Sequence, residues 1–249
     1  MDRFWPKVGD FRLDGEILKQ FLTQAIVLAR TDYGEADRIL TLLSADYGKL
    51  RLMARGVRKA KSKLAGGIEL FSVSDITFIN GRGEIGTLIS ARLVRHYGNI
   101  VKKIDRVQLG YDLIKVLHKS TEDEPEPEYF ALLEQAFIAL DQPDIAVELV
   151  RFWFSAQLLR LAGHSPNLQN DHVGTKLQAN EHYGFDFDAM TFELQADSQF
   201  GADHIKFMRL AFAGNQPAAL NQVQGSQRLL TAVMPLVQTM LATHLQRSA

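Results

Sequence analysis

Residues 48–67 read GKLRLMARGVRKAKSKLAGG, and this stretch decides how the front of the chain is interpreted. Side chains in a β-strand alternate between two faces. An extended conformation therefore places Leu50, Leu52 and Ala54 on one face. The opposite face then carries Lys49, Arg51, Met53 and Arg55. We expect a strand with one apolar side that faces a core and one cationic side.

A basic loop follows this strand. The alternation stops after Gly56, and the next cations are Arg58, Lys59, Lys61 and Lys63. No acidic residue stands between Asp46 and Glu69, whereas an ordinary solvated surface mixes both signs of charge. We therefore predict a binding site for a polyanion. The alternative interpretation is a lysine-rich loop that only increases solubility.

The charge of the chain is divided unevenly along its 249 residues. Residues 24–106 carry a net charge of +7, and residues 107–249 carry −8, although the whole chain sums to −1. A chain of this length can bury one large or two small cores, and we expect two domains. The anion-binding function is predicted for the front half.

The sequence has no cysteine, which excludes disulfides, thiolate zinc sites and cysteine nucleophiles. The first residues show no apolar run of signal-peptide length, and no stretch is long and apolar enough to span a membrane. We expect a soluble, cytoplasmic protein.

The pattern of apolar and turn residues along the sequence predicts an α+β protein with three parts. Residues 1–22 are an extension without a convincing period, to which we assign no function. Residues 23–98 contain short β-type segments separated by turn residues, which indicates a small barrel or sandwich of five strands. The expected strands are 23–30, 38–44, 49–55, 71–79 and 85–94.

Residues 99–249 are expected to form an α-helical domain. Apolar residues recur at helical spacing over 104–120, 129–140 and 145–162, and the third of these is apolar nearly all round. Further helices are predicted over 203–212 and from Ser226, a favourable N-cap, to 245, with Pro235 as a kink or restart. The segment 164–200 is irregular, with a short hairpin expected over 183–194.

Several short segments of the sequence resemble those of the RecO family of bacterial recombination and repair proteins. The similar features include YGE at 33–35, ARG at 54–56, the basic loop and GRGE at 81–84. The helix ending in a glycine turn before Pro166 and the last helix are also similar to the family pattern. The resemblance covers the chain from about residue 24 to its end. It is close in the N-terminal part and loose in the C-terminal part.

This resemblance implies an N-terminal five-stranded OB-fold barrel followed by a helical domain. It also implies binding of single- and double-stranded DNA and annealing of complementary strands. The implied partners are RecR and single-stranded-DNA-binding protein, with a functional link to RecA loading. Many relatives place zinc-binding cysteines after the central helix, whereas residues 167–183 contain none here, so we expect no zinc site and no cofactor.

The predicted DNA-binding residues are cations of the front half, which would neutralise phosphates along a groove. They are Lys49, Arg51, Arg55, Arg58, Lys59, Lys61, Lys63, Arg92 and Arg95. Tyr33 and Tyr47 lie in expected turns, where a ring either stacks on a base or packs over the end of the barrel. The GRGE segment is interpreted as a hairpin turn rather than a nucleotide-binding loop.

A second group of polar residues crowds the irregular segment and supplies possible metal ligands. It comprises His164, Asp171, His172, Glu181, His182, Asp186 and Asp188. Their spacing fits no known ligand pattern, and ordinary loop residues are the simpler interpretation. We expect a non-catalytic protein, and two alternatives stay open: a metal-dependent hydrolase of nucleic acid and an OB-fold module that binds RNA.

Overall fold

The computed structural model describes residues 7–13, 16–80, 83–121 and 126–245. Their contacts define two compact units, which are described separately. The front unit comprises the described residues of 1–102 and 121–137, and the rear unit those of 103–120 and 138–249. The division of the chain into folding domains at residue 98 stays a prediction.

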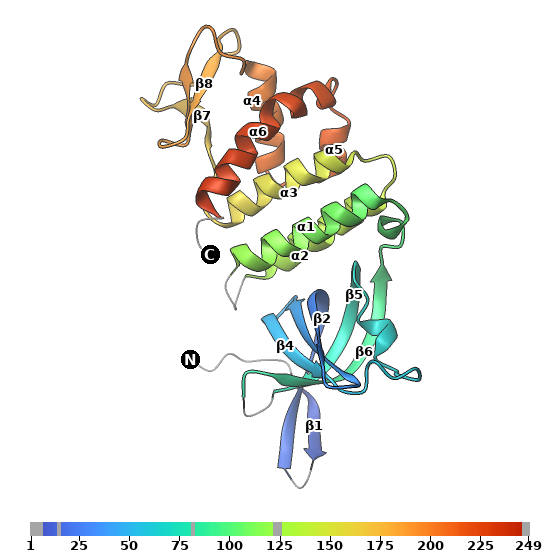
Figure 1. The fold of residues 1–249 in the computed structure, drawn as a ribbon. Coiled ribbons are helices and arrows are strands. Elements are labelled where there is room, and N and C mark those ends of the chain that lie inside the picture. The colour runs from blue at the N-terminus through green and yellow to red at the C-terminus, as the bar shows by residue number, and fades with distance from the viewer. Residues whose placement is uncertain (1–6, 14–15, 81–82, 122–125, 246–249) are drawn as a thin grey trace. The chain divides into compact units, whose positions relative to one another are not determined.

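The front unit is built on a mainly antiparallel sheet that closes on itself (Figure 1). Its strands are β1 (Lys7–Leu13), β2 (Glu16–Tyr33), β3 (Asp37–Ser44), β4 (Gly48–Ala54), β5 (Ser72–Ile79) and β6 (Gly86–His96). They are ordered β1-β2-β3-β4-β6-β5, and β5 pairs again with β2. The five strands β2–β6 therefore close into a barrel. This order is that of an OB-fold, as predicted.

The barrel is closed by its one parallel ladder. β4 and β6 are joined at two residue pairs, Leu52 with Gly86 and Met53 with Thr87. A Cβ atom at Gly86 would lie 2.7 Å from the backbone oxygen of Ile79 and 2.8 Å from a Leu52 methyl carbon. Glycine at this position therefore allows β6 to approach both of its neighbours.

The barrel core follows from the alternation of apolar residues along the strands. Leu40, Leu42, Leu52 and Ala54 are buried and belong to one apolar cluster, with Phe78 from β5. Burial of each large side chain contributes about 1.5–3 kcal/mol. The predicted division of the 48–54 segment into a buried and a solvent-facing side is confirmed.

Part of the predicted N-terminal extension is a β-hairpin. β1 pairs antiparallel with the beginning of β2, from Leu13 opposite Glu16 to Lys7 opposite Phe21. β2 is 18 residues long and begins seven residues before the strand that the sequence indicated. The hairpin escaped prediction because an edge strand is held by backbone hydrogen bonds to a single neighbour and needs no alternating pattern.

The rear unit is mainly helical. Its elements include α1 (Ile104–Ser120), α3 (Val147–Leu161), α4 (Ala202–Phe212), α5 (Pro217–Asn221) and α6 (Ser226–His244), and α2 (Pro127–Asp141) is shared by both units. α3 is buried along most of its length and packs against α1, α4, α5 and α6, which confirms its predicted central place. No helix of the described residues has the length and apolar character needed to cross a membrane.

Two details of α6 can be compared with the prediction. The N-cap is Gly225, with φ of 73°, and Ser226 is the first helical residue. The helix continues through Pro235, so the restart was wrong, while the alternative of a kink there stays a prediction. Proline removes only one intrahelical donor, and four residues later the Thr239 hydroxyl donates to the Pro235 carbonyl at 2.9 Å. The buried residues on both sides of the proline hold the helix in place.

Arg106 is a buried cation of the rear unit that the sequence did not single out. Its side chain is 4% exposed, and its guanidinium donates to four backbone oxygens, those of Leu140, Gln142, Pro143 and Ile145. These carbonyls end α2 and form the connection to α3. Arg106 therefore satisfies acceptors that a helix end leaves without partners.

Candidate nucleic-acid interface

The outer side of β4 carries the cations that the sequence placed there. Leu52 and Ala54 point into the core, and Arg51 and Arg55 are exposed. Lys49 is half-buried and donates to the backbone oxygen of Thr121. Two solvent-accessible guanidinium groups are therefore present here, that of Arg51 on β4 and that of Arg55 directly after the strand.

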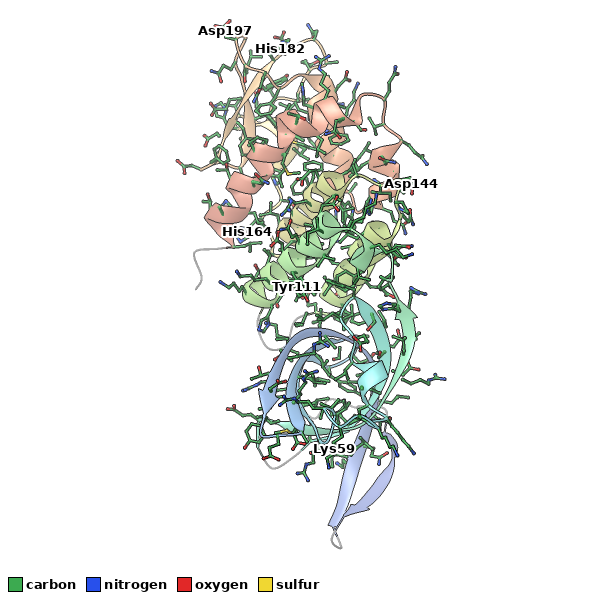
Figure 2. All side chains as sticks on the ribbon, turned by 45° about the vertical axis from the view of Figure 1, so that its right-hand side comes forward. Lys59, Tyr111, Asp144, His164, His182 and Asp197 are labelled. Atoms are coloured by element: carbon green, nitrogen blue, oxygen red, sulfur yellow. The ribbon has the colours of Figure 1, made fainter. Side chains whose placement is uncertain are left out.

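The basic loop after β4 is anchored at its beginning. The Gly56 amide donates to the Asp37 carboxylate at 2.7 Å, and the Arg58 amide donates to the Ala36 carbonyl at 2.9 Å. Between them, Val57 is buried in the barrel core. These contacts attach the loop to the β2–β3 turn, and its exposed side chains project outward. Figure 2 shows Lys59 on the surface of the front unit.

Some predicted site residues form ion pairs with acidic side chains. Arg92 lies 2.7 Å from Asp75, and Arg95 lies 3.0 Å from Glu134. Ion pairs of this kind lower the positive potential that a phosphate would meet. Arg51 has only a loose contact, 3.8 Å from the highly exposed Glu84.

Arg58 is also partly neutralised. Its guanidinium lies 3.6 Å from Asp32 and donates to the Gly34 carbonyl at 3.3 Å. The pKa of Asp32 is held below its usual value, chiefly by the hydrogen bond from Arg38 and also by the charge of Arg58. Asp32 is therefore ionised at neutral pH, and Arg58 contributes less than a full charge to the surface.

The side chains of four cations in the predicted set have no hydrogen bond or ion pair to any residue that the structure describes. They are Arg55, Lys59, Lys61 and Lys63, and we call them the free cations. All four are exposed and lie within nine residues. Unneutralised, mobile cations close together are the arrangement that attracts a chain of phosphates.

The two tyrosines differ in their accessibility. Tyr47 is buried in the barrel core, where its ring packs against Phe21 and Phe78 at centroid distances of 5.8 and 5.6 Å. It is therefore not available for stacking on a base. Tyr33 is 56% exposed at the end of β2. The GRGE turn cannot be compared fully, since residues 81 and 82 lie outside the described part of the chain.

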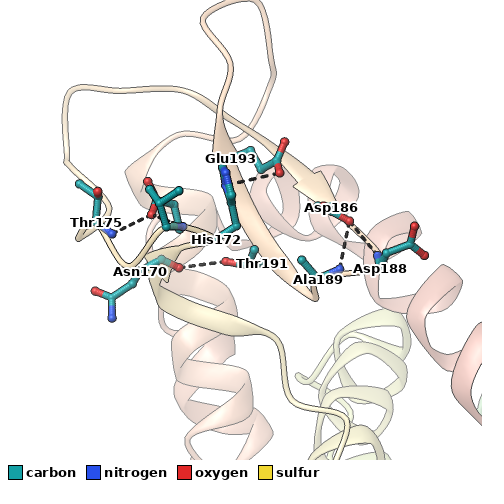
Figure 3. A network of polar contacts seen from close by, with 10 residues as sticks. Asn170, His172, Thr175, Asp186, Asp188, Ala189, Thr191 and Glu193 are labelled. Atoms are coloured by element: carbon teal, nitrogen blue, oxygen red, sulfur yellow. Dashed lines mark hydrogen bonds and ion pairs between the residues drawn. The ribbon is translucent and has the colours of Figure 1, made fainter.

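The polar residues of the irregular segment mainly support turns. This segment contains β7 (Asn167–Asp171), β8 (Tyr183–Asp186) and β9 (Thr191–Leu194), and β8 and β9 form the predicted hairpin. The Asp171 carboxylate accepts from the amides of Val173 and Thr175, and the Asp186 carboxylate accepts from those of Asp188 and Ala189 (Figure 3). These are Asx-type turns, whose carboxylates bind their own backbone.

One ion pair joins His172 to Glu193 at 3.4 Å in the same network (Figure 3). Within the described ranges, no three His, Asp or Glu side chains are grouped so that they could hold a metal ion. The seven predicted polar residues are therefore not brought together as a metal site.

The rear unit also contains a groove that the sequence did not indicate. It has a volume of about 560 Å³ and lies between α1, α3 and α6. Phe154 and Leu241 contribute apolar surface, and Lys115, Lys119 and Arg151 contribute positive charge. The spacing of these residues over three distant helices explains why no local pattern revealed the groove.

Comparison with known proteins gives two family matches. The model described as "Recombination protein O N terminal" matches residues 18–97, and the model described as "Recombination protein O C terminal" matches residues 113–249. The first match covers nearly the whole barrel from β2 to β6, and the second covers most of the rear unit.

Curated relatives carry the name "DNA repair protein RecO". One from Dehalococcoides mccartyi is 35% identical over 165 residues, which are 66% of this chain and 64% of the relative. One from Rubrobacter xylanophilus is 30% identical over 59% of both chains, and one from Rhodopirellula baltica is 34% identical over 58% of this chain and 54% of the relative. The chain thus spans less than two thirds of the length of these relatives.

Proposed function

Since the chain belongs to the RecO family of recombination proteins, we propose that it acts in DNA repair and homologous recombination as a DNA-binding mediator. In this proposal it binds single- and double-stranded DNA and anneals complementary strands. The observation that carries the proposal is the set of free cations, Arg55, Lys59, Lys61 and Lys63, on a loop anchored to an OB-fold barrel.

The mechanism is electrostatic. Two complementary strands repel each other through their phosphates, and cations that bind both backbones lower this repulsion. Lysine and arginine side chains that contact phosphates leave the base edges free to pair. Annealing of this kind needs no covalent step, no nucleotide and no metal ion, and we propose that the protein is not an enzyme.

The proposed partners are RecR and single-stranded-DNA-binding protein. Together with RecR, the protein would help to load RecA onto DNA that is coated with single-stranded-DNA-binding protein. These partners follow from the family, and the rear unit is the proposed scaffold for protein contacts. The formal charges of residues 103–120 and 138–249 sum to −1, so the rear unit offers phosphates no comparable excess of cations.

The test is the annealing rate of two complementary single strands, each coated with its cognate single-stranded-DNA-binding protein. The protein should accelerate pairing in buffer that contains chelator and no nucleotide, and it should leave both strands intact. A variant with the free cations replaced by glutamine should lose most of this acceleration. A matched variant with four rear-unit lysines replaced, Lys115, Lys119, Lys176 and Lys206, should keep it.

Other outcomes separate the alternatives. Strand cleavage that chelator abolishes would replace the mediator proposal with a metal-dependent hydrolase. Tighter binding to RNA than to DNA oligomers of equal length and sequence would replace it with an RNA-binding module. Binding without faster annealing would refute the mediator role and leave a plain DNA-binding protein.

A further inference from the structure

Asp37 is an acidic residue that lies against the loop of the free cations, where a negative charge should weaken the attraction for phosphates. It is the first residue of β3 and is half-buried. Its carboxylate accepts a hydrogen bond of 2.7 Å from the amide of Gly56, two residues beyond the end of β4. This amide stands in sequence between Arg55 and Arg58. The acid therefore binds the backbone of the loop at the point where its cations begin.

The backbone continues from this contact as a series of turns. Gly56 has a φ of 63°, a left-handed conformation that glycine adopts without strain. Its carbonyl accepts from the Lys59 amide at 3.1 Å, and the Lys59 carbonyl accepts from the Ser62 amide at 3.0 Å. The Ser62 hydroxyl then accepts from the Leu64 amide at 3.3 Å. Each turn begins at a residue that the preceding turn fixes, so the direction of the loop is set at Gly56.

The free cations depend on these turns for their positions. Lys59, Lys61 and Lys63 lie along them, and Arg55 directly precedes Gly56. Their side chains have no hydrogen bond or ion pair within the described part of the chain, so the backbone alone keeps them close together. Like charges repel, which favours a more extended loop. A hydrogen bond from an amide to a carboxylate is about twice as strong as one between neutral groups, and it opposes this extension.

We propose that Asp37 is a positioning residue of the DNA-binding site, which holds the loop in the arrangement that binds phosphates. This inference rests on the proposed DNA binding and identifies the group that organises its site. A loop that is already ordered loses less conformational entropy on binding. Without the anchor, only a fraction of the molecules would have the loop in the binding arrangement, and the apparent affinity would fall by that fraction. Simple electrostatics predicts the opposite sign, because loss of a negative charge should strengthen the binding of DNA.

The experiment compares three variants that each remove one negative charge: Asp37→Ala, Asp37→Asn and Glu35→Gln. Glu35 is the charge control, because it is an exposed acid in the turn before Asp37. Asparagine keeps an acceptor oxygen for the Gly56 amide, and alanine does not. Binding is measured by fluorescence anisotropy of a labelled oligo(dT) over a range of salt concentrations.

Asp37→Ala should bind oligo(dT) about tenfold more weakly than wild type. Its slope of log affinity against log salt should stay at the wild-type value, since every cation is retained. Asp37→Asn and Glu35→Gln should bind at least as tightly as wild type, and at most about twofold more tightly. Rescue by asparagine separates the acceptor role from the charge.

Hydrogen exchange measures the anchor in the absence of DNA. The amides of Gly56 and Lys59 should exchange faster in Asp37→Ala than in wild type, and in Asp37→Asn they should keep their protection. If Asp37→Ala shows no cooperative unfolding transition, Asp37→Ser takes its place, because the serine hydroxyl stands one bond short of the carboxylate oxygens.

Two results would overturn the role of Asp37 and leave the proposed function intact. One is tighter binding by Asp37→Ala, equal to that of Glu35→Gln, which would reduce Asp37 to a repelling charge. The other is equal weakening by Asp37→Ala and Asp37→Asn, which would make the acceptor oxygen irrelevant. A wild-type protein that does not bind oligo(dT) would overturn both proposals.

Discussion

Replacing the free cations tests whether they, rather than the overall charge of the front half, bind DNA. The variant Arg55→Gln/Lys59→Gln/Lys61→Gln/Lys63→Gln removes four positive charges and keeps side chains of similar length. All four side chains are exposed and lack partners among the described residues. Fold stability should therefore change little, since surface substitutions away from specific contacts are usually neutral.

The magnitude follows from counterion release. Each phosphate contact on single-stranded DNA contributes about 0.7 to the slope of log affinity against log salt. If all four side chains bind phosphates, the slope should fall by about 2.8, which corresponds to roughly 600-fold weaker binding at about 0.1 M salt. If two bind at any one time, the expected values are about 1.4 and roughly 25-fold.

The assay is fluorescence anisotropy of a labelled oligo(dT) over a range of salt concentrations. The control has the same change in net charge but on the rear unit, with Lys115, Lys119, Lys176 and Lys206 replaced by glutamine. Its slope should stay near the wild-type value. An unchanged slope in the loop variant, or an equal fall in both variants, would refute the assignment of the site to this loop.

Three further predictions concern the fold. Arg106→Met should lower the free energy of unfolding, measured by urea titration, by about 3 kcal/mol or more, because buried carbonyls lose their donors. The control Arg209→Met loses one such hydrogen bond and should lower it by about 1 kcal/mol. Gly67→Ala should destabilise by about 2 kcal/mol, since its Cβ would lie 2.4 Å from a backbone oxygen, and Gly66→Ala, with open space around it, should be neutral. Burial raises the pKa of Tyr97 to about 12, so its contribution to stability should be complete below about pH 10 and disappear as the pH rises through 12, which absorbance titration of wild type and Tyr97→Phe can follow.

The barrel strands were predictable because their signal is local. Alternation of Leu52 with Arg51 is visible within a few residues, and the same short range reveals the turns. The central position of α3 was equally visible, since a helix that is apolar all round must be buried. The N-terminal hairpin carried no such pattern, and the N-cap of α6 shifted by one residue because glycine with positive φ supplied the turn.

Whether a candidate site residue is exposed, buried or ion-paired was less predictable. Each of these depends on strand register and on side chains that are distant in sequence. Arg92 meets Asp75 because these residues lie directly opposite in the β5–β6 ladder. Tyr47 is enclosed by rings from β2 and β5. A count of charges along the chain contains neither relation, so it could identify the basic region but not separate its free cations from its paired ones.

The short ladder between β4 and β6 is a weak seam of the barrel, because few residue pairs join these two strands. β4 is attached to β3 by seven residue pairs and β6 to β5 by eight, but only two pairs join β4 to β6. We expect local opening to begin at this seam, since it has the fewest residue pairs of these ladders. In hydrogen exchange, amides of the seam should lose protection by local opening, while those between β2 and β3 exchange only when the whole barrel unfolds.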